Sequence, residues 1–241
     1  MLEAGAVHAR KGHMVSDRKE IVRRSGRLKT EIQVPPSLGA APVARADAQR
    51  NRCALIVATR EAIAARGLEV SALDIAKAAG LGVGTLYRRF GTKEALLGAV
   101  VLSFYDELCV LARECMERED PWDGLVEFVM QLAGAHRDNI GLAEVTAACE
   151  GPPSPELAER TAAVQEAVIQ LTDRVRATGV LRDDVTWQDI MICSRASLDT
   201  DHCLGVDAGP DGWRRVITLL LDGMRAPAHT PLTGPGPQVR P

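Results

Sequence analysis

Hydroxyl-bearing and cationic side chains gather between Ser71 and Lys93, and these are the residue types that bind nucleic acids. Tyr87, Arg88 and Arg89 are consecutive, and Lys93 follows shortly after them. Lysine and arginine neutralise backbone phosphates, and an arginine can donate two hydrogen bonds to the edge of a guanine. The stretch therefore indicates DNA binding, provided that its secondary structure presents these side chains on one surface.

A first short helix is predicted from Ser71 to a turn at Gly80. Ser71 and Asp74 have the spacing of a capping box, in which each side chain satisfies an unpaired amide of the first helical turn. Gly80 can adopt the positive φ that a tight helix end requires. The residues that recur at helical spacing and form the predicted apolar face are Leu73, Ala76 and Ala79.

A second helix is predicted to follow, with Gly82 at its N-cap position. Its apolar stripe consists of Val83, Leu86, Tyr87 and Phe90, and the side chains that point elsewhere are Thr85, Arg88 and Arg89. Thr92 begins a further helix with Lys93 in its first turn, where a cation opposes the helix dipole, and a phosphate contact would explain it. The pattern predicts a helix-turn-helix whose second helix enters the DNA major groove.

An upstream helix from Arg50 to Arg66 precedes this pair, and Gly67 is its expected end. Residues 1–44 lack sustained periodicity and contain Pro35 and Pro36, so they are predicted to form a disordered basic arm. Two alternatives stay open for this arm. It contacts DNA as minor-groove arms do, or it is an artefact of the translation start, because Met14 is another possible start.

The residues from about Arg45 to Leu97 resemble the tetracycline-repressor (TetR) family of one-component bacterial regulators. The matching residues stand in a fixed register, which comprises Ser71, Ile75, Ala76, Ala79, Gly80, Gly84, Thr85, Leu86, Tyr87, Phe90 and Lys93 to Leu96. The resemblance implies an all-α homodimer with an N-terminal three-helix helix-turn-helix DNA-binding domain (45–95). A larger helical ligand-binding and dimerisation domain (96–226) would follow, and the tail (227–241), rich in proline and glycine, is predicted to be disordered.

The resemblance also implies roles for individual residues. Phosphate contacts fall on Ser71, Tyr87 and Lys93, and base contacts on Val83, Thr85 and Arg88. Gly84 would let the DNA approach the helix backbone closely. The predicted DNA-binding residues are together Arg45, Arg50, Ser71, Gly82, Val83, Gly84, Thr85, Tyr87, Arg88, Arg89, Thr92 and Lys93.

Two departures from the family pattern and two alternatives bear on this set. Gly82 stands where a serine is usual, which weakens one phosphate contact, and Val83 occupies an often polar position, where its side chain suits a thymine methyl. Tyr87 could instead be a core side chain with its hydroxyl at the rim. Arg89 could be an exposed solubilising charge.

The charge distribution supports the same division. Residues 45–95 carry nine Lys and Arg against five Asp and Glu, whereas residues 96–241 carry 12 against 23. A basic head on an acidic body suits binding to a polyanion with a strong salt dependence. The acidic body would be repelled by DNA, which helps to fix the docking orientation.

Composition excludes several other classes. No apolar run reaches the roughly 18 residues of a membrane span, and the polar N-terminus is no secretory signal. No nucleophile elbow, phosphate loop or set of metal ligands is present, so the chain is expected to be no enzyme and to need no cofactor or metal. The six scattered cysteines suit reduced thiols, so we expect a cytoplasmic protein without membrane partners.

The body reads as a string of helices. The ranges predicted for them are Thr92 to about Arg118, Trp122 to about His136, Leu142 to Cys149, Pro155 to Thr178, Thr186 to about Cys203 and Pro210 to Arg225. Pro155 suits the first position of its helix, and Thr186 with Asp189 forms a capping box. In the family, the last two such helices pair with those of a second copy, although their apolar face could equally pack within one chain.

The same helices supply candidate residues for a small-molecule site. They are Phe104, Tyr105, Leu108, Phe128, Met130, Leu132, His136, Met191 and Arg195. Plain core packing is the alternative for most of them, and an i,i+4 pair with Asp199 is the alternative for Arg195. The pocket is expected to be largely apolar, as small-molecule sites generally are.

These observations predict a ligand-responsive transcriptional regulator. It would bind a palindromic operator in double-stranded DNA as a homodimer, act as a repressor and be released by a small apolar or amphipathic molecule. The alternative is a thiol-based redox sensor that uses Cys109 and Cys115, or Cys193 and Cys203, although the spacings within each pair disfavour an intrachain disulfide. The effector, the operator and the regulated genes cannot be derived from the sequence.

Overall fold

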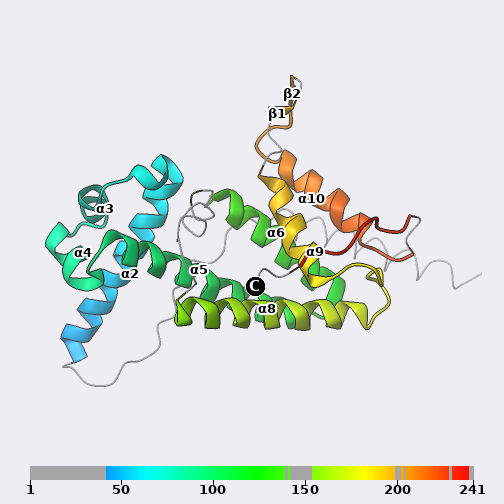
Figure 1. Ribbon diagram of the computed structural model, residues 1–241, viewed down its shortest axis with the longest axis horizontal. Helices are drawn as coiled ribbons and strands as arrows, with labels where there is room; N and C mark the ends of the chain where they lie inside the picture. The colour runs from blue at the N-terminus through cyan, green and yellow to red at the C-terminus, as the bar shows by residue number, and fades with distance from the viewer. Residues whose placement is uncertain are drawn as a thin grey trace, which may run out of the picture. The chain divides into compact units, whose positions relative to one another are not determined.

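The computed structural model describes residues 42–138, 141, 154–198, 202–203, 205–227 and 230–238 (Figure 1). These residues form an all-α protein, as the sequence predicted. They divide into two compact units. The N-terminal unit takes residues up to Leu108 and, further along the chain, Asp138–Val164, and the C-terminal unit takes Cys109–Arg137 and the residues from Gln165 onward.

Three helices build the head of the N-terminal unit: α2 (Pro42–Arg66), α3 (Ala72–Ala78) and α4 (Val83–Phe90). A 3₁₀ turn, η1 (Gly67–Glu69), connects α2 to α3, and α3 packs against both α2 and α4 (Figure 1). Helix α2 begins at Pro42 instead of at Arg50, so the last residues of the expected disordered arm are helical. Residues 1–41 lie outside the described residues.

The turn between α3 and α4 has the predicted backbone chemistry. Gly80 has a φ of +68°, a conformation that costs glycine little because it has no Cβ. Gly82 is the N-cap of α4 without a side-chain cap. The predicted capping box of α3 is only half present. The Ser71 hydroxyl accepts from the Asp74 amide at 3.1 Å, whereas the Asp74 carboxylate accepts from that hydroxyl and not from the Ser71 amide.

The core of this head consists of buried aliphatic side chains, which are Leu55, Ile56, Ile63, Val70, Ile75, Ala76, Leu86 and Leu96. One predicted core position is wrong. Leu73 was assigned to the apolar face of α3, but it is 63% exposed. Leu73 and Ala76 do have helical spacing, but α3 has only seven residues, and the side of its first turn that carries Leu73 faces solvent.

Four further helices are α5 (Lys93–Met116), α6 (Pro121–Asp138), α8 (Pro155–Arg176) and, near the C-terminus, α10 (Gly212–Gly223). Helix α5 has the length and mean hydropathy of a membrane span, a test that the core helix of a soluble protein also passes, and 56% of its most apolar window is buried. The expected helix between Leu142 and Cys149 lies outside the described residues.

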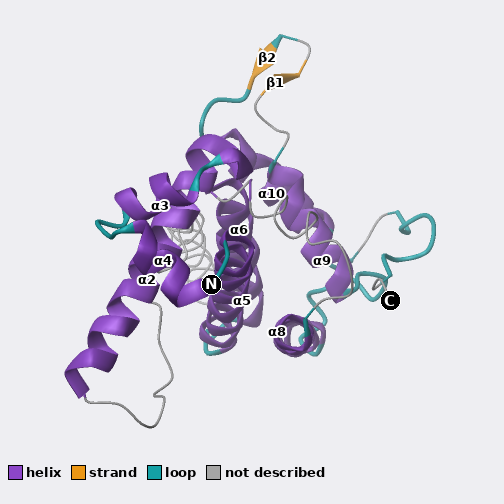
Figure 2. Ribbon diagram, turned by 60° about the vertical axis from the view of Figure 1, so that its left-hand side comes forward, coloured by secondary structure: helices purple, strands orange, loops and turns teal. Residues whose placement is uncertain are grey.

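The segment before α10 differs from its predicted form. Helix α9 (Trp187–Ser194) begins with the predicted capping box of Thr186 and Asp189, but it ends at Ser194 and continues only as a 3₁₀ turn, η2 (Arg195–Ser197). The single helix predicted as far as Cys203 is therefore wrong. Strands β1 (His202–Cys203) and β2 (Val206–Asp207) form a small antiparallel hairpin that projects beyond α10 (Figure 2). Gly205, with a φ of +80°, makes the reversal that no helix could accommodate.

Part of the tail predicted to be disordered is bonded to the loop after α8. The Arg182 guanidinium donates to the carbonyls of Gly223 and Thr230, and it pairs with Asp184 at 2.8 Å. The Asp184 carboxylate in turn accepts from the Leu232 amide, and these donors hold its pKa well below the usual range. Residues 230–232 are thereby fixed to the C-terminal unit.

Candidate DNA-binding surface

Helix α4 presents one polar face opposite a narrow buried edge. Of its eight residues, all of them described, Leu86 is the buried one, and Phe90 lies one turn further along the same side. Gly84 and Arg88 are exposed, and Thr85 beside them is half-buried. Because residues three and four apart share a helix face, these three residues form a single outward surface, which we call the α4 outer face.

Tyr87 and Arg89 flank this face. Tyr87 is 49% exposed, so it is not the core side chain that the alternative interpretation required. Arg89 is exposed as well, and Val83 is half-buried at the start of the helix. Of the predicted apolar stripe, Leu86 is buried, and Val83 and Phe90 are half-buried. The prediction is wrong for Tyr87, which is exposed.

Lys93 has a partner that the sequence did not indicate. Its Nζ donates to the carbonyl of Leu68, in η1, at 2.7 Å. This bond fixes the start of α5 to η1, which supplies a structural reason for a cation in a first helical turn. An ammonium has three N–H donors, so the predicted phosphate contact remains compatible with this bond. Thr92 caps α5, since its hydroxyl accepts from the Ala95 amide at 3.0 Å.

The predicted phosphate contact of Ser71 faces a competitor. The Ser71 hydroxyl already donates to the Asp74 carboxylate at 2.8 Å, and Arg66 lies 3.5 Å from the same carboxylate. A phosphate at Ser71 would have to replace the first bond and would meet the negative charge of Asp74. The contact stays a prediction.

Helix α2 contributes cations at its N-terminal end. Arg50 is exposed and pairs with Asp47. The side chain of Arg45 lies outside the described residues. Arg52, which sequence reasoning did not single out, stacks over the Phe90 ring with its Cζ 5.6 Å from the ring centroid. No local signal could have found it, because the two residues are neighbours only through the packing of α2 against the end of α4.

The candidate ligand residues are divided between the two units. Phe104, Tyr105 and Leu108 belong to the N-terminal unit, and the other six belong to the C-terminal unit. The side chains that are buried, as core packing requires, are Phe104, Leu108, Phe128, Met130 and Leu132. Their role in ligand binding stays a prediction.

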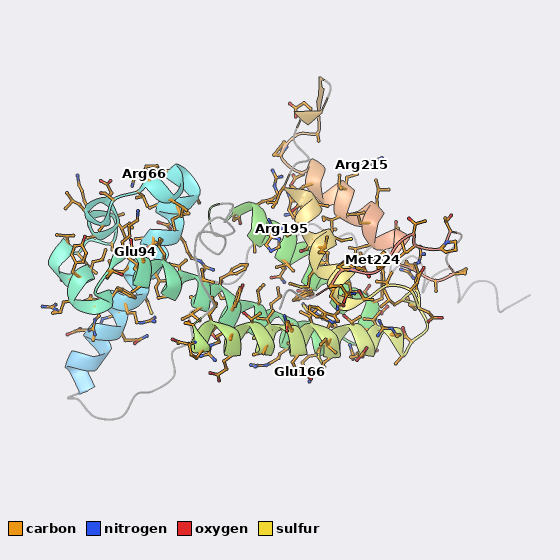
Figure 3. All side chains as sticks on the ribbon, in the orientation of Figure 1. Arg66, Glu94, Glu166, Arg195, Arg215 and Met224 are labelled. Atoms are coloured by element: carbon orange, nitrogen blue, oxygen red, sulfur yellow. The ribbon has the colours of Figure 1, made fainter. Side chains whose placement is uncertain are left out.

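The polar members of the ligand set have perturbed surroundings. Burial raises the pKa of Tyr105, although a hydrogen bond with Thr161 lowers it. Burial, with the nearby charge of Arg195, lowers the pKa of His136 to about 4, so this imidazole is neutral near pH 7. Arg195 itself is exposed directly after α9 (Figure 3), and Asp199, its proposed partner, lies outside the described residues.

The thiols give no support to the redox alternative. Cys109 and Cys115 are buried, and burial raises the pKa of Cys115 to about 12, so its reactive thiolate is scarce near pH 7. Burial also raises the pKa of Cys193. The side chain of Cys203 lies outside the described residues. Among the described residues, no cluster of three His, Cys, Asp or Glu side chains could hold a metal ion.

Three packed helices, of which the last is exposed and cationic and follows a glycine turn, define a helix-turn-helix protein. Comparisons with known proteins agree. Residues 55–100 match the model of bacterial regulatory proteins of the tetR family, and residues 120–226 match that of the C-terminal domain of SbtR-like transcriptional regulators. The chain belongs to the TetR family of transcriptional regulators, which are soluble DNA-binding proteins.

Individual relatives are similar over different lengths. A TetR regulatory protein from Mycobacterium vanbaalenii is 27% identical, with a TM-score of 0.60 over 76% of this chain and 99% of that protein. A TetR regulator from Streptomyces coelicolor is 26% identical, with a TM-score of 0.58 over 73% and 99%. An HTH-type transcriptional regulator of Staphylococcus aureus is 33% identical over 81 residues, which span 32% of this chain and less than half (42%) of that relative.

Proposed function

We propose that this regulator is a repressor that binds a palindromic operator as a homodimer and leaves it when a small apolar or amphipathic molecule binds the body. The observation that carries the DNA-reading part is the α4 outer face. Its Gly84, Thr85 and Arg88 point away from the buried anchor Leu86, as a helix seated in the major groove requires. Arg88 donates to a guanine, Thr85 contacts a neighbouring base, and Tyr87 and Lys93 contact phosphates.

The homodimer is supported by the last two helices of the chain. Ile192 on α9 is 56% exposed and Leu219 on α10 is 62% exposed, although large aliphatic side chains usually gain from burial. Helices α9 and α10 lie side by side in Figures 1 and 2, and Figure 3 shows Arg215 on the same α10. Family members typically act as dimers. A second copy would cover these side chains and place two heads on successive major grooves, about 34–36 Å apart.

Release by the effector requires a difference in affinity between two conformers. To weaken operator binding 100-fold, the effector must favour the released conformer by about 2.7 kcal/mol. The neutral state of His136 and the many apolar side chains of α6 suit an uncharged, largely apolar effector. A broad screen in which no small molecule changes operator binding would contradict this part of the proposal.

The decisive experiment is a selection of random-sequence DNA by the purified protein at about 150 mM salt, a condition that suppresses purely electrostatic binding. We expect a two-fold symmetric motif. A folded dimer that enriches no motif would contradict the proposed operator recognition. If a motif is found, the genes beside it in the source genome would indicate the class of effector.

Arg88→Ala should weaken binding to the selected operator by about 1–3 kcal/mol and relax the preference at one base pair in each half-site. The reason is that the alanine loses both hydrogen bonds to a single guanine. Titration of the operator and of its single-base variants by fluorescence anisotropy measures both effects. An equal loss of affinity for every sequence would instead identify Arg88 as a backbone contact.

Gly84→Ala should raise stability and lower DNA affinity at once. Outside its own helical turn, no atom lies within 4 Å of the position of an added Cβ, and alanine in a helix is favoured over glycine by up to about 0.5–1 kcal/mol. If DNA approaches the backbone of Gly84 closely, the methyl group should cost about ten-fold in operator affinity, or about 1.4 kcal/mol. Thermal unfolding and anisotropy titrations measure the two effects, and unchanged affinity would refute the close approach.

A further inference from the structure

Helix α4 packs against α3, but few of its own side chains are buried in that contact. It is two turns long, its N-cap Gly82 offers no side-chain hydrogen bond, and Leu86 is its one buried residue. The packing against α3 and the short turn hold the N-terminal end of α4, and a single buried side chain adds little that would fix the rotation of its C-terminal end about the helix axis. The base-facing side chains depend on that rotation, because a small turn of the helix displaces their tips by more than it displaces the backbone.

The second contact is at the far end of α4. The guanidinium of Arg52, on α2, lies over the Phe90 ring with Cζ 5.6 Å from the centroid. Phe90 is the last residue of α4, and both side chains are half-buried. A planar guanidinium is attracted to the face of an aromatic ring, and a cation near the end of a helix also interacts favourably with its last carbonyl groups. Gly91, with a φ of +77°, then ends the helix.

Leu86 and Phe90 are one turn apart on the same side of α4, so together their contacts form a line along one side of the helix and limit its rotation. Arg52 holds the distal end of this line. We propose that Arg52 is a positioning residue that sets the orientation of α4 through Phe90 and thereby determines how sharply the protein distinguishes its operator from other DNA. This inference rests on the proposed base contacts of Thr85 and Arg88.

A matched control lies on the same helix. Arg50 carries the same charge, two residues before Arg52, but its side chain is 67% exposed and pairs with Asp47 instead of an aromatic ring. Removing either arginine takes one positive charge from the head. Only removal of Arg52 abolishes the stack on Phe90. A difference in DNA binding between the Arg52 and Arg50 variants therefore reports the orientation of α4 and not the loss of charge.

The experiment measures the ratio of affinities for the selected operator and for a scrambled duplex, at several salt concentrations. The proteins are the full chain and its Arg52→Ala, Arg52→Lys and Arg50→Ala variants. Arg52→Ala should reduce the ratio between about two-fold and thirty-fold, the range expected for loss of a cation–π contact. Arg52→Lys should recover little of it, because an ammonium lacks the planar stacking surface. Arg50→Ala should weaken binding to both duplexes alike and leave the ratio unchanged.

Two results would overturn the inference. If Arg52→Ala keeps the wild-type ratio and only flattens the salt dependence, with Arg52→Lys restoring it, then Arg52 is a phosphate contact. If Arg52→Ala and Arg50→Ala behave alike, the stack has no role in orientation. Should Arg52→Ala fail to fold, Arg52→Lys decides alone. A wild-type ratio near one would instead refute the proposed base reading, which is a separate outcome.

Discussion

Glu107→Gln should lower the free energy of unfolding by about 3 kcal/mol, because it leaves the Arg60 charge buried without a counter-charge. Both carboxylate oxygens of Glu107, on α5, accept from Arg60, on α2, at 2.6 and 3.1 Å. The two side chains are only 9% and 11% exposed. Ser103 also donates to this carboxylate, and the Phe104 ring lies beneath the guanidinium. Urea denaturation followed by far-UV circular dichroism measures the loss.

The double variant Arg60→Met with Glu107→Leu supplies the control. Replacing both members of a buried ion pair with apolar side chains is often neutral or stabilising, because neither desolvated charge remains. We therefore expect the double variant to be more stable than Glu107→Gln. Equal losses in the two proteins would show that the effect comes from altered packing between α2 and α5 and not from the unpaired charge.

Gly124→Ala should destabilise the protein by about 2 kcal/mol, within the usual range for overpacking a core. An added Cβ would lie 2.4 Å from the backbone carbonyl oxygen of Cys115, and that backbone cannot move aside as the end of a flexible side chain could. Gly124 is buried near the start of α6, so the first turn of α6 and the last turn of α5 would have to separate. The midpoint of thermal unfolding should fall accordingly.

Gly98→Ala is the matched control for this second experiment. Gly98 is also a helical glycine, in the second turn of α5, but nothing lies within 4 Å of its added Cβ. Alanine should therefore stabilise the protein by about 0.4–1 kcal/mol, since it restricts the unfolded chain without a clash. If both variants lose stability equally, the close approach of α5 and α6 is not the cause.

The head could be predicted largely from local sequence chemistry. The turn at Gly80 and the N-cap at Gly82 depend on residues next to one another. Outside the head, the same is true of the capping box of Thr186 and Asp189 at the start of α9. Such features are encoded within one or two turns of helix. The exposed Arg88 follows from them, because the buried position of Leu86 fixes which side of α4 faces outward.

The contacts that fasten the head could not be predicted in this way. Lys93 meets Leu68 across 25 residues of chain, and Arg52 meets Phe90 only after α2 and α4 have packed. A cation carries no sign of whether its partner is a carbonyl, an aromatic ring or a phosphate. The sequence therefore indicated that a lysine is unusual in the first turn of α5, but it could not show whether the partner of Lys93 lies within the protein or in DNA.

The end of α9 was missed for a related reason. The helix from Thr186 was predicted to reach about Cys203, and no structure was predicted between Cys203 and Pro210, where Gly205 makes the reversal. Two-residue strands are too short to show an alternating pattern. The ligand residues could not be resolved at all, because apolar side chains on buried helices have the same sequence pattern whether they line a site or fill a core.

The guanidinium of Arg182 has a consequence for the order in which a newly made chain can fold. It is bonded to the carbonyl of Thr230, which the ribosome adds 48 residues later. Domains generally fold as units during synthesis, beginning with the N-terminal one. The three-helix head can thus acquire its structure early, whereas the loop around Arg182, although its cation can already pair with Asp184, obtains its hydrogen bonds to Gly223 and Thr230 only after the tail has emerged.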